Sequence, residues 1–103
     1  MAYKLRFVQE FEEGRRAEFL ALEKQFAVLE RENPAFPKGR RYLPLSGREP
    51  THTLIWECEF ETLDGAFAAL KFLGSDPEHE ALYDRQSKLF TRAYTEIYQT
   101  FEG

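Results

Sequence analysis

Hydrophobic and polar residues alternate along Thr51–Thr62, THTLIWECEFET. Side chains of an extended strand point alternately to opposite faces, so a period of two indicates a strand with one face in a core. One face carries His52, Leu54, Trp56, Cys58 and Phe60, and the other carries Thr53, Ile55, Glu57, Glu59 and Glu61. The pattern predicts a central strand whose apolar face meets helices.

Three further segments are typical of strands. Tyr3–Phe11 and Arg92–Phe101 alternate in the same way. Arg40–Leu45 is shorter, and Pro44 favours an edge position because proline cannot donate a ladder hydrogen bond. Residues 46–49 then serve as a hairpin loop into the central strand.

Helical spacing governs the rest of the chain. Apolar residues recur every three or four positions in Arg15–Glu32, which predicts an amphipathic helix ended by Asn33 and Pro34. Its apolar stripe consists of Phe19, Leu22, Phe26 and Leu29, and its polar side of Arg16, Glu23, Lys24, Glu30 and Arg31.

Two more helices follow the central strand. Thr62 is the expected N-cap of a helix that Gly74 closes, with a stripe of Leu63, Ala66, Phe67, Leu70 and Leu73. Ser75 is the expected cap of the next helix, which Glu78 supports in a capping box and which continues to about Leu89.

The order strand, helix, strand, strand, helix, strand predicts an α+β, ferredoxin-like βαββαβ domain over residues 1–103. Right-handed crossovers place the helices on one face of a four-stranded antiparallel sheet, with the first and third strands central. The other face would carry Val8 and Ile55 among charged residues, with no helix to cover it. Packing two such faces together, as in a dimeric α/β barrel, would cover them, so we expect a homodimer through the open sheet face.

The segment Thr51–Glu80 also resembles a known family. It combines His52, Leu54-Ile55-Trp56, Phe60-Glu61-Thr62-Leu63-Asp64, Leu70 and Ser75-Asp76-Pro77-Glu78. This combination is similar to the NIPSNAP-like branch of the dimeric α/β-barrel superfamily, which shares an H-x(2–3)-W strand, a helix and a D-P-(E) helix start. The resemblance implies a homodimer with a pocket in each protomer, between the sheet and the helices or at the barrel mouth. The superfamily spans cofactor-free monooxygenases, haem-degrading enzymes, isomerases and uncharacterised proteins, so it implies no single activity.

Composition and net charge limit the classes of binding partner that we expect. Hydrophobic residues make up 43% of the 103 residues, which is enough for a core, and the net charge of −4 argues against nucleic acid and anionic membranes as partners. The first 30 residues contain no apolar run, so we expect neither a signal peptide nor a membrane span, and a cytoplasmic location. The single cysteine, Cys58, is interpreted as a small core residue.

Our candidate ligand site consists of His52, Trp56, Tyr42 and Tyr94. His52 and Trp56 share a strand face about 13 Å apart at Cα, and His52 would supply the polar group. Tyr42 and Tyr94 come from the outer strands, and a register slip of one residue would turn either away. The structural alternatives are a hydrogen-bonded strand-end role for His52 and a core role for Trp56.

Other polar groups have simpler interpretations. Glu57 and Glu59 could tune each other for acid–base chemistry, or pair across strands with Lys4 and Arg6. His79, between two glutamates, is interpreted as part of a solvated helix face, and the two histidines lack the spacing of a metal site. The basic residues of the loop region, which could hold an anion or lie in solvent, are Lys38, Arg40, Arg41 and Arg48.

Two functions fit these observations, and whether the protein is an enzyme stays open. The first is a homodimer that binds a small hydrophobic or aromatic molecule, extending to a cofactor-free monooxygenase-like enzyme. The second is a non-enzymatic structural or interaction dimer. We expect no cofactor, because the Asn, Trp and His of the haem-degrading branch align with apolar positions near Phe7, Ala69 and Leu82.

Overall fold

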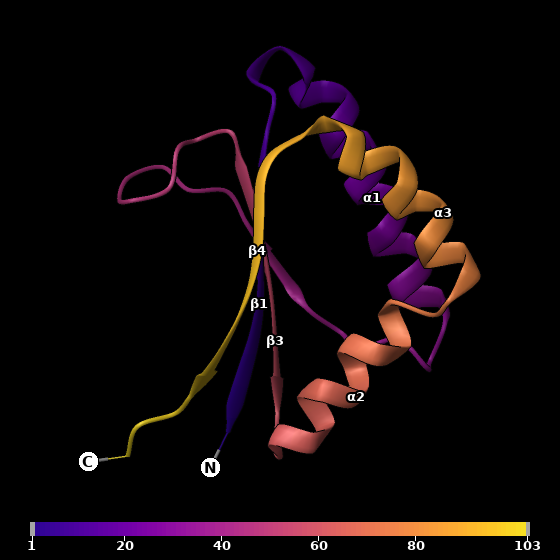
Figure 1. Cartoon of the computed structure of the whole chain (residues 1–103), viewed down its shortest axis with the longest axis vertical. Coiled ribbons are helices and arrows are strands. Elements are labelled where there is room, and N and C mark those ends of the chain that lie inside the picture. Colours follow the sequence, from indigo (N-terminus) through magenta and orange to yellow (C-terminus); the bar gives the residue numbers. More distant parts are fainter. Residues whose placement is uncertain (1, 103) are drawn as a thin grey trace.

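The computed structural model describes residues 2–102 as one sheet with helices packed on one face (Figure 1). The strands are β1 (Tyr3–Phe11), β2 (Arg40–Tyr42), β3 (Thr53–Phe60) and β4 (Phe90–Gln99). The helices are α1 (Arg16–Glu32), α2 (Leu63–Leu73) and α3 (Pro77–Gln86), with short 3-10 turns at Glu13–Arg15 and Ser87–Leu89.

The sheet confirms the predicted ferredoxin-like order. Its strands run β2-β3-β1-β4, with antiparallel pairing throughout, so β1 and β3 are central. Leu5 pairs with Cys58 and Phe7 with Trp56 across the two central strands, which places these four side chains on the helix-facing side. Figure 1 shows α1, α2 and α3 on that same side of the sheet.

The core lies where α1 packs on the sheet near Phe11, the last residue of β1. Phe11 and Phe19 are fully buried there, and their rings stack with centroids 4.3 Å apart. The stripe of α1 supplies this contact because residues three and four positions apart share one helix face. The buried cluster is completed by Leu22, Leu54 and Leu89.

The ends of α2 and α3 are set by capping side chains. Thr62 accepts a hydrogen bond from the backbone N–H of Gly65, which confirms it as the N-cap of α2. The cap of α3 is Asp76 rather than the expected Ser75, because the Asp76 carboxylate accepts from the backbone N–H of His79 at 3.0 Å. The Ser75 hydroxyl instead donates back to the carbonyl of Phe72.

The face opposite the helices is partly covered, which corrects our expectation for it. Val8 and Ile55 are only 2% and 8% exposed. The long loop of residues 43–52 lies on this side of the sheet in Figure 1, and the Tyr94 hydroxyl donates to Glu49 of that loop at 2.6 Å. The loop therefore does part of the covering that we had assigned to a second protomer.

No helix among residues 2–102 is long and apolar enough to cross a membrane.

Candidate functional site

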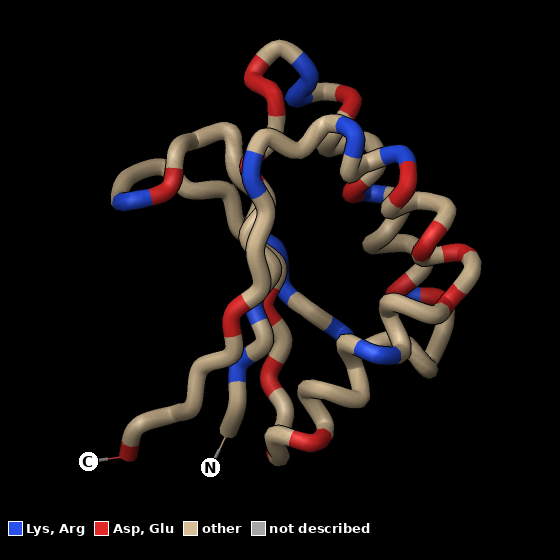
Figure 2. Tube along the Cα trace, viewed as in Figure 1, with Lys and Arg blue, Asp and Glu red and all other residues tan. Residues whose placement is uncertain are grey.

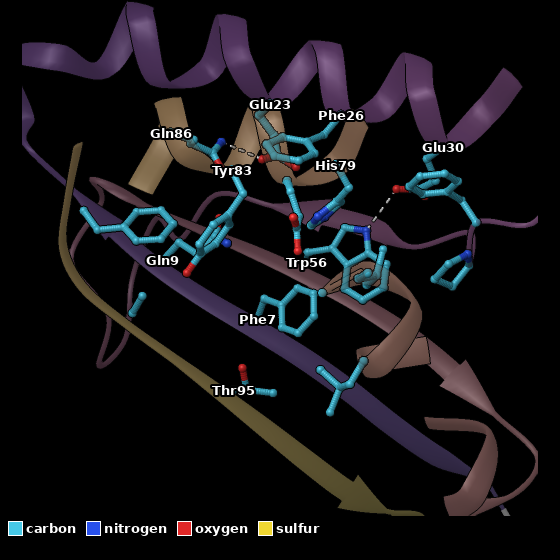
Figure 3. A pocket seen from close by; sticks show the side chains of 18 of the residues that line it. Phe7, Gln9, Glu23, Phe26, Glu30, Trp56, His79, Tyr83, Gln86 and Thr95 are labelled. Carbon is cyan, nitrogen blue, oxygen red and sulfur yellow. Dashed lines mark hydrogen bonds between the residues drawn. The ribbon is translucent and has the colours of Figure 1, made fainter. Parts of the chain in front are cut away.

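A cleft of about 590 Å³ lies between the helix-facing side of the sheet and the helices (Figure 3). This volume falls within the range of about 300–1,000 Å³ that is usual for small-molecule sites. Aromatic rings from both layers form much of its wall. They are Phe7, Phe26, Phe36, Trp56, Tyr83 and Phe90.

Trp56 is the centre of the sheet-side wall, and its position is fixed on three sides. Its ring stacks on Phe7 with centroids 5.0 Å apart, and its indole Nε1–H donates to Glu30 at 3.2 Å. A Cβ placed on Gly39 would lie 2.2 Å from the indole ring, so only glycine allows the backbone this close. Trp56 is 6% exposed and faces the helices, which confirms the predicted orientation of β3.

Behind Trp56, a chain of polar side chains joins α1, β2 and α3. Arg41 donates through Nε to Glu23 at 2.6 Å and through a terminal nitrogen to Glu30 at 2.8 Å. Gln86 donates to the other oxygen of Glu23 at 2.8 Å, and the backbone N–H of Gly39 donates to the other oxygen of Glu30. Both carboxylates are therefore buried and bonded at both oxygens.

Burial shifts the pKa values of the side chains in this polar network. It raises the pKa of Glu23, an effect that the neighbouring Glu30 reinforces and that Gln86 and Arg41 oppose. Burial also acts to lower the pKa of Arg41, but its hydrogen bonds and charge interactions with Glu30 and Glu23 outweigh that effect and raise it. Arg41 is therefore a permanent cation, already shared by two carboxylates.

His79 faces the cleft from the first turn of α3, which corrects its interpretation as a solvated residue. Its ring centroid lies 4.9 Å from that of Phe26 and 6.3 Å from that of Phe36. Burial lowers the pKa of His79, against the raising effects of Asp76 and Glu80. The imidazole is thus held in its neutral form beside the aromatic wall.

Our assignment of Glu23 and Glu30 to the solvent side of α1 is wrong. Both follow a stripe residue by four positions, Glu23 after Phe19 and Glu30 after Phe26, and seven residues separate them from each other. That spacing places them on the edge of the apolar face, two turns apart. Arg41 pairs with Trp56 across β2 and β3 and so points to the same side. The sequence therefore did contain a signal for this cluster. It consists of two glutamates seven positions apart beside an apolar helical stripe, and of a basic residue, Arg41, in a strand that the helix would cover.

The comparison with known proteins gives the fold. No family model matches the sequence, and no curated protein matches it. Among solved structures, a NIPSNAP family protein from Agrobacterium tumefaciens superposes with a TM-score of 0.79 at 16% identity, covering 99% of this chain and 95% of that one. This chain therefore has the ferredoxin-like fold of that NIPSNAP family protein.

Two other solved structures also superpose on this chain over nearly its whole length. One, described as an antibiotic biosynthesis monooxygenase, has a TM-score of 0.74 at 10% identity and covers 97% of this chain and 99% of its own. The other, from Bacteroides fragilis, is described as a dimeric protein of unknown function with a ferredoxin-like fold. It has a TM-score of 0.70 at 16% identity, with 96% of both chains covered.

The structure does not bring the side chains of the four predicted ligand residues of this chain together in one cleft. Trp56 and Tyr94 both border the cleft. However, Tyr42 pairs with Ile55 and Tyr94 with Val8, so both tyrosine side chains point to the opposite face of the sheet, and Tyr94 borders the cleft through its backbone. On that opposite face the two tyrosines border a second concavity of about 370 Å³. The physical reason is register, since a side chain changes face with every residue along a strand.

His52 lies outside the cleft, just before β3. Its backbone carbonyl accepts from the N–H of Phe11 at 3.0 Å, and its Nδ1 lies 3.5 Å from a carboxylate oxygen of Glu13. Its ring packs edge-on against Phe11. These contacts match the strand-end role that we gave as its structural alternative.

The other polar candidates have structural partners. Glu57 pairs with Arg6 at 2.7 Å and with Lys4 at 3.5 Å, as the cross-strand interpretation predicts. Lys38 donates to backbone carbonyls at the end of α1, and Arg41 is bonded to Glu23 and Glu30, so neither of these two basic residues is available to an anion. Burial raises the pKa of the Cys58 thiol, which keeps it protonated. Within residues 2–102, no group of three or more potential metal-ligating side chains is placed to hold a metal ion.

Proposed function

We propose that this protein is a homodimer that binds a small hydrophobic or aromatic molecule in the cleft between sheet and helices. The observation that carries the proposal is the cleft itself, a concave site of about 590 Å³ with aromatic walls. Buried polar groups at one side, from Glu23 to Trp56, give such a site orientation as well as room. The NIPSNAP-like fold supports the proposal by analogy only.

The second protomer would dock on the sheet face opposite the cleft. The large apolar or aromatic side chains that remain exposed on that side include Tyr42, Leu45 and Tyr98. The charges beside them are already paired, because Arg6 bonds Glu57 at 2.7 Å and Glu96 at 3.2 Å. A face with paired charges and exposed apolar side chains can be covered by a copy of itself at a lower desolvation cost than a face with unpaired charges.

Two functions of the protein are compatible with a molecule bound in the cleft. The likeness to an antibiotic biosynthesis monooxygenase supports a monooxygenase-like enzyme, for which the neutral imidazole of His79 would serve as proton acceptor. A non-enzymatic binding dimer is supported by the buried carboxylates, since Glu23 and Glu30 are fully engaged by protein donors and neither is free to act as a base.

The cleft can be tested by filling it. Ala93 lines the cleft from β4, and Ala93→Trp should occupy the space without disturbing the core. The probe is N-phenyl-1-naphthylamine, whose fluorescence rises when it enters an apolar site. We expect saturable binding to the wild type and at least about tenfold weaker binding to the variant, because the added ring takes the probe's place.

Ala68→Trp is the matched control, because Ala68 is exposed on α2 and lies outside the cleft lining. It should bind the probe like the wild type. No saturable binding to the wild type, or equal binding by Ala93→Trp, would reject the cleft as the ligand site.

A further inference from the structure

The cleft is lined by more acidic than basic residues. Arg41 is the only lysine or arginine in the lining formed by residues 2–102, and four carboxylates accompany it: Glu23, Glu30, Glu80 and Asp84. Burial raises the pKa of Glu23, but three carboxylates would still face one guanidinium if Glu23 were protonated. Figure 2 shows the same excess along α3, where acidic positions predominate. The field inside the cleft is therefore negative.

Arg41 is not available to an anionic ligand. Its Nε and one terminal nitrogen are bonded to Glu23 and Glu30, at 2.6 Å and 2.8 Å. An anion approaching Arg41 would also approach both of those buried carboxylates. Repulsion between like charges is strongest where water is excluded, so the cleft disfavours a carboxylate or phosphate group.

His79 adds an acceptor to this surface. Burial lowers the pKa of the imidazole, so the ring beside Phe26 is neutral at pH 7.5. A neutral imidazole that donates through one nitrogen can only accept through the other. With Glu80 on the same helix also bordering the cleft, this wall offers acceptors that a ligand N–H group would satisfy.

The opposite wall suits the rest of such a ligand. The stacked rings of Phe7 and Trp56 present an aromatic surface on the sheet side, and Phe26 presents another from α1. Aromatic faces attract cations as well as apolar groups, because the ring quadrupole places negative charge on the face. A flat apolar body with an ammonium group therefore matches both walls.

We propose that the ligand of the cleft is a hydrophobic or aromatic amine, bound as its cation, with the ammonium group beside the acidic residues and His79 of α3. This rests on the proposed function, because it names the chemical class of the molecule that the cleft binds. The acidic pair Glu80 and Asp84 selects the charge, and the aromatic wall holds the body.

The test compares three naphthalene derivatives of similar size by titration calorimetry at pH 7.5 and low salt. They are 1-naphthylmethylamine, a cation, 1-naphthylmethanol, which is neutral, and 1-naphthoate, an anion. We expect the amine to bind at least about tenfold more tightly than the alcohol and the anion most weakly. The preference should shrink in 0.5 M NaCl, because salt screens the solvent-exposed carboxylates of Glu80 and Asp84.

Two variants locate the selectivity. Glu80→Gln with Asp84→Asn removes two charges at the cleft and should reduce the preference for the amine to about twofold. Glu78→Gln with Asp64→Asn removes the same net charge from exposed positions outside the lining and should keep the preference. Circular dichroism confirms that both variants fold.

The outcomes separate the two proposals. Equal binding of amine and alcohol, tighter binding of the anion, or an unchanged preference in the Glu80 and Asp84 variant would overturn the amine assignment while ligand binding in the cleft stands. Binding of none of the three compounds would overturn both.

Discussion

Gly39 and Trp56 illustrate how one residue fixes another in this protein. The indole ring occupies the space that a side chain at position 39 would need. A Cβ on residue 39 would lie 2.2 Å from the nearest ring atoms. We expect Gly39→Ala to lower the free energy of unfolding by about 1–3 kcal/mol, because either the backbone or the ring must move in a closely packed site. Urea denaturation measures the change, and the blue-shifted emission of buried Trp56 should shift to longer wavelength.

Gly14 provides the matched control for this prediction. A Cβ at Gly14 would meet nothing within 4 Å, and the residue is exposed. Gly14→Ala should change the free energy of unfolding by no more than about 0.5 kcal/mol. If the two alanine variants were equally stable, the close contact between Gly39 and the indole would have no energetic weight.

His79 should give the fold a measurable pH dependence. Burial lowers its pKa in the folded state below the ordinary value of about 6.5, so between these two values the unfolded chain binds a proton that the folded chain does not. The corresponding stability is present above about pH 6.5 and is lost as the pH falls through the folded-state value. Urea unfolding at pH 7.5 and at pH 5 should show this loss.

The variant His79→Gln isolates the effect. Without the imidazole, the part of the acid destabilisation that belongs to this residue disappears, so the stability difference between wild type and variant should shrink as the pH falls. A difference that stays constant from pH 7.5 to pH 5 would show that His79 titrates alike in the folded and unfolded chain.

At the scale of elements, the start of α3 depends on Asp76. Its carboxylate accepts from the N–H of His79 and so satisfies one of the unpaired donors of the first turn. Asp76→Ala should destabilise the protein by about 1 kcal/mol. Ser75→Ala removes only an exposed hydroxyl bonded to Phe72, so thermal unfolding should detect a smaller loss. The reverse order would return the capping role to Ser75.

Periodicity was sufficient to predict the framework of the protein. The alternation in β1 and β3 and the stripe of α1 run through long segments, where a wrong assignment of the helix-facing side would expose many apolar groups at once. The predicted order of strands and the placement of helices on one face are therefore confirmed.

Periodicity did not predict the site, for two physical reasons. A binary pattern treats every glutamate as solvated, whereas Glu23 and Glu30 are buried because Arg41 and other donors satisfy them. In the short strand β2, the face of Tyr42 depended on a register that no long alternation fixed. In both cases, the burial of the glutamates and the face of Tyr42, the outcome depended on residues of another helix or strand.

At the scale of the whole molecule, the sheet separates two surfaces with different properties. The helix side holds the cleft with its acidic wall. The other side holds the loop of residues 43–52, the paired charges around Arg6 and several exposed apolar side chains. Because the two lie on opposite faces of one sheet, a protomer can be covered on the loop side while its cleft stays open to a ligand.

This arrangement leads to the prediction that the protein is a dimer through its loop side. Light scattering at micromolar concentration should give about twice the chain mass of 12.1 kDa. Leu45 is 90% exposed on the loop, and Leu45→Asp should shift the protein toward the monomer, because it places a charge in the proposed apolar contact. Phe67→Asp is the control, since Phe67 is exposed on α2 in the helix layer, and this variant should remain dimeric. A monomeric wild type would reject the dimer. A dimer that survives Leu45→Asp but dissociates in Phe67→Asp would place the interface on the helix layer instead.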